Sequence, residues 1–437
     1  MANTVAKYQK YAEYKDSGVE WLGDIPSHWE TCSISKLFAI KAGGDVDLKN
    51  FSEDRSEEYP YPIYTNANDE NSIYGYSKVA NYQANSITVS GRGEVGFSVY
   101  RDHPFEAIIR LLVLTPQKKC YPKFYAYYIN EVINFRVESS AIGQLSTLQI
   151  SPYKTVLPSI DEQKLISNYL DHETAKIDSL ITKQEKLIEL LKEKRQAVIS
   201  HAVTKGLNPD VVMKDSGVEW LGQVPEHWIV KSYRHASKIY RGKFGHRPRN
   251  DPAFYDGEYP FIQTGDVARA GKHITSYSQT LNEKGKEVSQ LFPKGTLMMA
   301  IAANIGDLAI LGFEAYAPDS VVGFKPNQDI DLEFLRYSFM AALPALEQTS
   351  TQSTQANLNV ERIGAVQGVF PSLNDQQEIV GYLDDMLNKY SVIEKEMHKA
   401  IELLQERRTA LISSAVTGKI DVRNWQDPNE AKTELSL

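Results

Sequence analysis

The chain has 437 residues and a formal net charge of -8, and 42% of its residues are hydrophobic. This length is typical of two or three domains, and the acidic balance excludes a protein that binds nucleic acid through its overall charge, so such a function would need local basic patches. The two cysteines, the polar N-terminus and the lack of a long apolar run favour a cytoplasmic protein with no disulfide framework, no cysteine-held metal and no membrane contact.

A tryptophan-rich motif occurs twice along the chain. Residues 15–29 read KDSGVEWLGDIPSHW and residues 214–228 read KDSGVEWLGQVPEHW. The tryptophans could form a stacking surface for a partner, or they could pin the chain to its own domain. We favour the structural role, because large aromatic side chains contribute most of their energy when they are buried.

A globule of mixed secondary structure follows each tryptophan motif, over about residues 30–157 and 229–370. Strand-like runs separated by Gly, Asn and Asp turns precede one helix-like segment in each copy, at residues 122–133 and 331–343. Matching residues lie 198 positions apart at Pro62 but 210 apart at Gly96, so the second copy has an insertion between them. We expect two α+β globules, with the insertion most simply in surface loops.

A long helix follows each globule, over residues 158–206 and 371–420. Each begins with a serine N-cap and an acidic residue three positions later, Ser159 with Glu162 and Ser372 with Asp375. Apolar residues spaced three or four apart predict a heptad seam on both helices. The seam is expected to include Leu180, Leu187 and Leu191 on the first helix and Ile393, Leu404 and Leu411 on the second.

The two long helices are expected to pair with each other, because a helix of this length cannot bury its apolar stripe alone. The alternative is that each helix lies on its own domain. Since the second globule begins soon after the first helix ends, the pair should be antiparallel, with pseudo-twofold-related globules at opposite ends. The expected domains are residues 1–157, 158–206, 207–370 and 371–420, followed by a C-terminal tail at 421–437.

The clearest charge feature is a basic run at residues 231–249, which has seven Lys or Arg and no carboxylate. In an acidic protein this run indicates nucleic-acid binding, although it could also be a solvated surface. Asn- and Gln-rich tracts such as QTGD at 263–266 add side chains that can bridge base edges. The candidate DNA-binding residues are Lys41, Asn66, Lys78, Arg92, Arg101, Gln144, Arg241, Lys243, His246, Arg247, Arg249, Thr264, Asn304, Gln355 and Asn357.

No motif for catalysis or cofactor binding stands out. Residues 91–96, GRGEVG, formally match the dinucleotide fingerprint, but a strand-like run follows them where the fingerprint needs a helix. We interpret them as a turn between strands with Arg92 at its tip. We therefore expect no catalytic residue, no metal and no cofactor.

The duplicated plan resembles a known family. The GVEWLGDIPSHW motif, the PSIDEQ start of the first long helix and the repeated globule–helix order are similar to those of specificity subunits of type I restriction–modification systems. The resemblance implies two target recognition domains that each read one half of a bipartite, asymmetric double-stranded DNA site. It also implies that the long helices bind two methyltransferase subunits, which recruit the restriction subunits.

Residues beside the seam are the candidates for this partner contact. They are Lys183, Lys186, Glu189, Leu190 and Lys194, with Glu396, Lys399, Glu402, Leu403 and Arg407 in the second copy. The alternative functions are a scaffold that binds only proteins and an enzyme such as a fused methyltransferase. A salt-dependent affinity for DNA separates the first alternative from a DNA-reading subunit, and a methylation assay on the purified chain separates the second.

Overall fold

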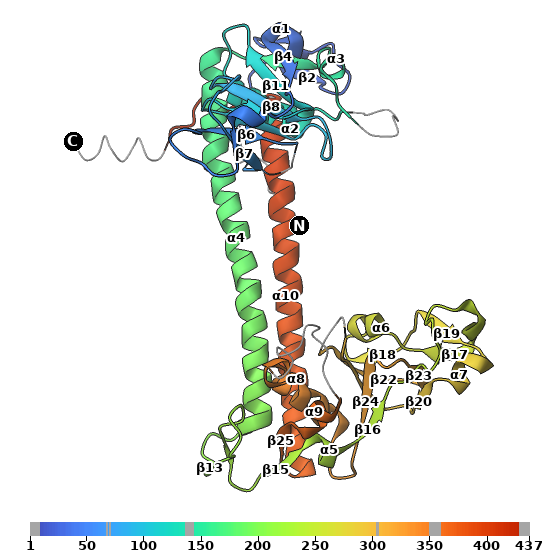
Figure 1. The fold of residues 1–437 in the computed structure, drawn as a ribbon. Coiled ribbons are helices and arrows are strands. Elements are labelled where there is room, and N and C mark those ends of the chain that lie inside the picture. The colour runs from blue at the N-terminus through green and yellow to red at the C-terminus, as the bar shows by residue number, and fades with distance from the viewer. Residues whose placement is uncertain are drawn as a thin grey trace. The chain divides into compact units, whose positions relative to one another are not determined.

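The computed structural model describes residues 9–66, 69, 71–135, 144–302, 306–348 and 360–427. The chain divides into two compact units, one made of residues 1–184 and 399–437 and the other of residues 185–398. Each unit contains one α+β globule and part of both long helices, α4 (Ile160–Lys205) and α10 (Leu373–Val416) (Figure 1). The α+β class and the two repeated globules agree with the sequence predictions.

The first globule is built on two four-stranded sheets with the orders β4-β11-β8-β9 and β10-β6-β7-β5. Strand β8 is buried along its whole length, because β11 and β9 pair with it on both sides and its Ile87 and Val89 pack into the core. The strands are β3 (Glu30–Ser33), β4 (Phe38–Ala42), β5 (Phe51–Ser52), β6 (Tyr61–Tyr64), β7 (Ile73–Ser77), β8 (Ser86–Ser90), β9 (Ser98–Arg101), β10 (Glu106–Ala107), β11 (Leu111–Pro116) and β12 (Lys154–Leu157). The helices are α1 (Ile34–Leu37), α2 (Pro122–Val132) and α3 (Thr147–Ile150), with a 3-10 turn, η1, at Leu48–Asn50.

The second globule repeats this plan with sheets β16-β24-β21-β22-β18 and β19-β17-β23-β20. Its strands are β15 (Ile229–Ser232), β16 (Ser237–Arg241), β17 (Tyr255–Phe261), β18 (His273–Ile274), β19 (Gln279–Leu281), β20 (Gln290–Phe292), β21 (Leu297–Ala300), β22 (Leu308–Leu311), β23 (Ala315–Ala317), β24 (Val321–Pro326) and β25 (Gln367–Phe370). Its helices are α5 (Tyr233–Ala236), α6 (Thr264–Arg269), α7 (Glu283–Glu287), α8 (Leu332–Gln348) and α9 (Val360–Ala365), with a 3-10 turn, η2, at Pro252–Phe254.

The insertion in the second copy is not confined to surface loops, which corrects the sequence expectation. It contributes α6 and β18, and Val267 and Ile274 from these elements belong to a buried cluster with Met298 of β21. An insertion that brings its own apolar residues can extend the core, and the sequence comparison of the two copies did not weigh this composition.

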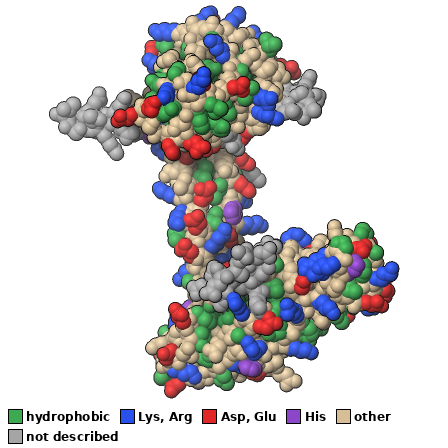
Figure 2. All heavy atoms as spheres, in the orientation of Figure 1, with side chains coloured by type: hydrophobic (Ala, Val, Ile, Leu, Met, Phe, Trp, Pro, Cys, Tyr) green, Lys and Arg blue, Asp and Glu red, His purple; other side chains and the backbone are tan. Residues whose placement is uncertain are grey.

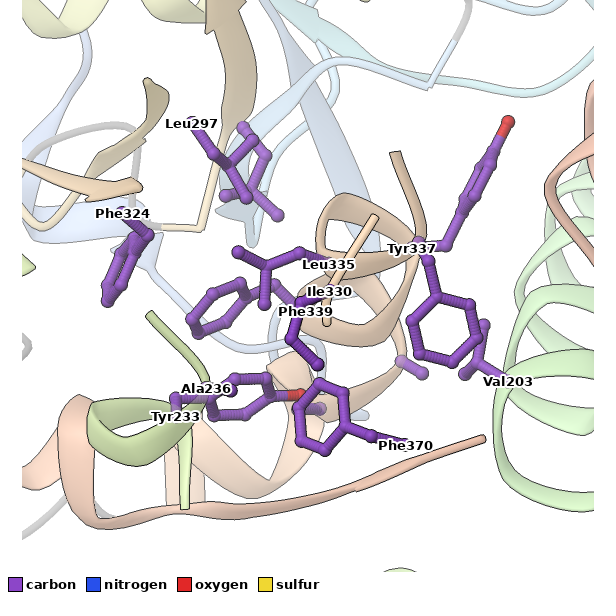
Figure 3. Close-up of a cluster of buried hydrophobic side chains, with 14 of the residues drawn as sticks. Val203, Tyr233, Ala236, Leu297, Phe324, Ile330, Leu335, Tyr337, Phe339 and Phe370 are labelled. Carbon is purple, nitrogen blue, oxygen red and sulfur yellow. The ribbon is translucent and has the colours of Figure 1, made fainter. Parts of the chain in front are cut away.

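The first and last strands of each globule pair with each other next to the long helices. Strand β3 pairs antiparallel with β12, and β15 pairs in the same way with β25. The main core of the second unit lies next to this closure, where Tyr233, Phe339 and Phe370 pack together (Figure 3). Val203 of α4 joins the same cluster, so the globule and the helix share one core.

The helices run antiparallel within each unit, as predicted. In the first unit, Ile166 and Ile177 near the start of α4 share a buried cluster with Leu411 and Ala415 near the end of α10. In the second unit, residues near the end of α4, including Ile199, pack with residues near the start of α10.

Two arginines at repeated positions add polar contacts between the helices. The Arg408 Nε donates to Asp178 Oδ1 at 2.9 Å in the first unit. The Arg195 guanidinium donates to Glu394 at 3.1 Å and to Ser391 in the second unit. Asp178 and Ser391 occupy equivalent places in the two copies, so the same arginine contact has two different acceptors.

The predicted apolar seam has the wrong phase over part of its length. Leu180 is 48% exposed, Leu187 49% and Ile393 47%, so they lie outside the seam. Ile177 is 5% exposed and Ile188 6%, with Ile181 partly buried between them. Helix α4 has two apolar rows that are one residue apart, Leu180 with Leu187 and Ile181 with Ile188. A shift of one residue turns a helix by about 100°, so the two rows face in different directions. Both rows satisfy the heptad spacing, and the prediction chose the row that faces outward.

The tryptophan motifs are structural anchors, as predicted. Each contains a short hairpin, β1 (Tyr14–Asp16) with β2 (Asp24–Pro26) and β13 (Met213–Asp215) with β14 (Gln223–Pro225). Trp29 and Trp228 are buried, whereas Trp21 is about half exposed.

In the first motif the buried Glu162 carboxylate at the start of α4 accepts three hydrogen bonds. Tyr11 Oη donates at 2.6 Å and Trp29 Nε1 at 3.0 Å, and His28 Nε2 lies 3.1 Å away. Burial and the neighbouring carboxylate raise the pKa of Tyr11, so its hydroxyl remains a donor.

The second motif lacks this arrangement. Asp375 replaces Glu162 and lines an open cavity of about 290 Å³ beside Trp228 and His227. In the first unit the segments at the two ends of the described chain also join the anchor, because the Asp421 amide donates to Gln9 O at 2.7 Å and Tyr14 Oη to Gly418 O at 3.0 Å.

We expect Ile177→Ala to lower the free energy of unfolding by about 2–4 kcal/mol, because it empties a site inside a buried cluster. Leu180→Ala, three residues away, should lower it by less than about 1 kcal/mol, because that side chain is exposed. Urea unfolding followed by circular dichroism measures both. Equal losses would place Leu180 in the buried seam.

Glu162→Ala should lower the free energy of unfolding by about 2–4 kcal/mol, because it leaves the buried Tyr11 and Trp29 donors without an acceptor. Asp375→Ala is the matched control at the repeated position, and we expect it to change stability by less than about 1 kcal/mol, the range of a helix N-terminal charge. Urea unfolding monitored by tryptophan fluorescence compares the two, and a larger loss for Asp375→Ala would contradict the assignment.

Candidate nucleic-acid interface

The ends of several strands meet at one edge of the first globule. Asn66, just after β6, holds this edge together, because its Nδ2 donates to Ile109 O at 3.0 Å and its Oδ1 accepts from Gly91 N at 2.9 Å. A side chain at Gly91 would place Cβ 2.3 Å from Arg110 O, so only glycine fits there. Asn66 therefore shapes the edge with both ends of its amide.

Arg92 and Gln144 meet at this same edge. They form an antiparallel bridge, and the Leu145 amide donates to Gly91 O at 2.8 Å. Arg92 is exposed in the turn between β8 and β9, the position expected from the sequence. Arg110 beside it has a φ of 75°, which is rare for a residue with a side chain and is held by the surrounding bonds. We call Asn66, Arg92, Arg110 and Gln144 the first strand-end surface.

The other three candidate DNA-binding residues of this globule have different surroundings. Lys41 is exposed on β4, two residues before Gly43, which bridges to Ile109 at the same edge. Lys78 forms an ion pair with Glu58. Arg101 is buried, with its guanidinium 3.5 Å from the centre of the Tyr64 ring and its Nε bonded to Thr88, so we assign it to the core in place of the predicted DNA contact.

Part of the predicted basic run supports the fold of the second globule. Lys231 pairs with Asp329 at 2.7 Å. Arg234 donates to the backbone oxygens of Gly364 and Glu361, and Arg241 lies 3.4 Å from the Glu361 carboxylate. These cations are neutralised or bound within the globule, which reduces the free charge of the run.

The cations at the end of the basic run are exposed and only partly neutralised. Arg247 and Arg249 lie 3.5 and 2.5 Å from one carboxylate, Asp319, so the group keeps a net positive charge. Lys243 is exposed beside them. His246 is held differently, stacked on Phe254 at 4.0 Å and 3.0 Å from Asp251. Lys and Arg side chains with a histidine are visible on the outer part of this globule in Figure 2.

A pocket of about 440 Å³ opens beside these arginines. It is lined by Phe244, Arg249, Asn250, Pro252, Tyr255, Asp256, Phe261, Gln263, Gln279, Pro318 and Ser320. Gln263 follows β17 as Thr65 follows β6 in the first copy, so the pocket lies at the edge that matches the first strand-end surface. We call this group the second strand-end pocket.

The sequence identified this pocket only in part. Thr264 is half-buried as the first residue of α6, next to Gln263 of the predicted QTGD tract. Asp256 and Gln279 were missed, because neither lies in the basic run or in one of the Asn- and Gln-rich tracts, and both reach the pocket through strand pairing. Asn304, Gln355 and Asn357 lie outside the described residues.

All ten predicted partner-binding side chains on the long helices are exposed. Leu190 is 46% exposed and Leu403, at the repeated position, 55%. They join the outward-facing Leu180, Leu187 and Ile393, so each unit has apolar side chains on the open faces of its helices. Exposed apolar side chains grouped in this way are typical of surfaces that bind another protein.

None of the described helices combines the length and the hydropathy needed to cross a membrane. Within the described ranges, no group of three or more His, Cys, Asp or Glu side chains is placed to hold a metal ion.

Comparison with solved structures relates the fold to known proteins. A chain from a structure titled as the basis of complex assembly and conformational transition of the type I R-M system has a TM-score of 0.68 at 11% identity, over 90% of this chain and 98% of that one. The HsdS subunit from Thermoanaerobacter tengcongensis has a TM-score of 0.51 at 11% identity, over 91% and 98%. At this identity the likeness concerns the fold.

Comparison of sequences gives the family. A putative type I specificity subunit of Mycoplasma pneumoniae is 34% identical over 167 residues, which cover 37% of this chain and about half (48%) of the relative. The EcoDI specificity subunit of Escherichia coli is 21% identical over 435 residues, covering 93% of this chain and 92% of the relative. The family described as type I restriction modification DNA specificity domain matches residues 26–190 and 243–403. The chain therefore belongs to this family, as a specificity subunit of a type I restriction–modification system.

Proposed function

We propose that this subunit reads a bipartite, asymmetric site in double-stranded DNA and positions other subunits of the system on it. The observation that supports this most is the repetition of one globule with two different strand-end surfaces. The match to a DNA specificity domain favours this function over a scaffold that binds only proteins. Modification and restriction are then carried out by the partner subunits, and the chain itself supplies recognition.

The two half-sites should differ in sequence. The first strand-end surface offers an exposed Arg92 on a turn fixed by Asn66, and an arginine of this kind suits guanine in the major groove. The second strand-end pocket has amides, a carboxylate and aromatic rings. Surfaces with such different hydrogen-bonding groups cannot prefer the same bases, so the complete site is not a palindrome.

Backbone binding in the second half-site is assigned to Lys243, Arg247 and Arg249. Cations on phosphates contribute affinity regardless of sequence and make binding depend on salt. Because Asp319 neutralises part of this charge, the non-specific component is limited. A chain with net charge -8 then relies more on base contacts than a strongly basic protein would.

Partner binding is assigned to the exposed faces of α4 and α10. Leu190 with Lys186 and Glu189 on α4, and Leu403 with Glu402 on α10, give two equivalent sets of apolar and charged side chains. Equivalent sets suit two copies of one partner. We therefore propose that two methyltransferase subunits bind here, and that restriction subunits join through them in the cytoplasm.

The decisive experiment exchanges residues 30–157 for the matching globule of a related subunit. Strands β3 and β12 bring the two ends of this segment together, so the exchange leaves the helices intact. We expect one half of the methylated motif in cells to change and the other half to remain. Genome-wide methylation mapping in cells that carry the partner subunits reads the result.

The reciprocal exchange of residues 229–370, closed by β15 and β25 in the same way, is the control and should change the other half only. Both halves changing in either chimera would contradict the modular function. An unchanged motif in both chimeras would show that these globules do not read DNA.

The partner surface is tested with Leu190→Asp and Leu403→Asp. A charge placed at an apolar anchor should weaken its contact by about 30-fold or more, so each single variant should bind one methyltransferase subunit and the double variant none. Leu148→Asp, at an 84% exposed leucine of the first globule, is the matched control and should bind two. Native mass spectrometry of the assembled complex counts the subunits, and two bound copies in the double variant would refute the assignment.

A further inference from the structure

An irregularity in β17 shapes the second strand-end pocket. Tyr255 and Tyr259 both lie opposite Leu281 of β19, so the strand bulges between them. Asp256, inside the bulge, has a φ of 59°. Bulges redirect side chains, and a residue held at positive φ is a strain that its surroundings must support. The bulge places an exposed carboxylate on the rim of the pocket.

The floor of the pocket is rigid and aromatic. Phe244 stacks on Tyr255 with ring centres 5.7 Å apart, and Phe261 lies 5.6 Å from Phe244. Phe244 and Phe261 are almost fully buried. Side chains fixed in this way hold the neighbouring polar groups in place, as a reading site requires.

Two side-chain amides, those of Gln263 and Gln279, also line the pocket. The Gln263 Nε2 donates to Gln279 Oε1 at 2.9 Å, and Gln279 is paired with Phe261 across the strands. This bond orients the Gln279 amide, and no described side chain or backbone group accepts from its N–H donors, so they can bind a ligand. The Asp256 side chain makes no hydrogen bond or ion pair with any other described residue, so its carboxylate can accept from the same ligand.

The pocket is lined by one carboxylate, Asp256, and one arginine, Arg249, which disfavours a simple phosphate site. A phosphate offers only acceptors, which the Asp256 carboxylate repels. Of the three cations assigned to phosphates, Lys243 and Arg247 lie outside the lining of the pocket, and Arg249, which lines it, is paired with Asp319. A ligand with a donor next to an acceptor matches Asp256 and Gln279 together. In the major groove adenine presents this pair, an N6 amino group beside the N7 acceptor.

We propose that the second strand-end pocket reads one adenine of the second half-site, with Gln279 donating to N7 and Asp256 accepting from the N6 amino group. This assignment rests on the proposed DNA-reading function and specifies two residues that contact a base. Gln263 is a positioning residue, because it holds the Gln279 amide in orientation.

The experiment selects sequences from a random duplex DNA library with the full-length chain. Asp256→Ala and Gln279→Ala, which remove the acceptor and the donor, should each reduce the preference for adenine about 5- to 100-fold, the range for one base contact, and at the same single position. Gln367→Ala, an exposed glutamine on β25 of the same unit, is the matched control and should leave the selected motif unchanged.

The variant Asp256→Gly tests the same contact if another variant at Asp256 folds poorly. Glycine adopts the positive φ of this position without strain, so this variant should melt at or above the wild-type temperature and still lose the adenine preference. An unchanged motif in Asp256→Gly and Gln279→Ala, or affinity lost equally for every sequence, would overturn the inference. If the wild-type chain selects no sequence at all, the proposed function fails instead.

Discussion

A hydrogen bond between a tyrosine of each globule and an aspartate of a long helix is repeated in both units and links each globule to its helix. Tyr127 Oη donates to Asp171 Oδ1 at 2.8 Å in the first unit, and Tyr337 Oη donates to Asp384 Oδ1 at 2.5 Å in the second. Burial, followed by the neighbouring aspartate, raises the pKa of both tyrosines, so they remain donors at any physiological pH. A lysine completes each contact, Lys123 in one unit and Lys272 in the other.

The repeated contact explains how one scaffold can hold two different strand-end surfaces. Each globule shares a core with its stretch of α4 and α10 and is closed by a pair of strands next to it. The strand-end surfaces lie at the ends of β6, β8 and β17, which belong to other sheets than the closing pairs β3-β12 and β15-β25. Changes at those strand ends can therefore alter the exposed groups without disturbing the core contacts that hold the globule on the helices.

The sequence predicted the features that can be found by comparing the two repeats within the chain. The α+β globules, the long helices and their antiparallel pairing follow from residues that match at fixed offsets. The phase of the seam did not follow, because Leu180 with Leu187 and Ile181 with Ile188 satisfy the same spacing rule. Packing against residues such as Leu411, far away in sequence, selects one row, and a local pattern has no information about such a partner.

The same limit applies to the candidate site. Residue type identified Arg92 as a displayed cation, but Arg101 has the same chemistry and is buried against Tyr64. Asp256 and Gln279 come together only because β17 bulges and pairs with β19. Phosphate-binding cations can be found from a charge run, since they act at long range. Base-reading groups must meet a base edge within hydrogen-bond distance, so their identification requires the strand pairing that places them.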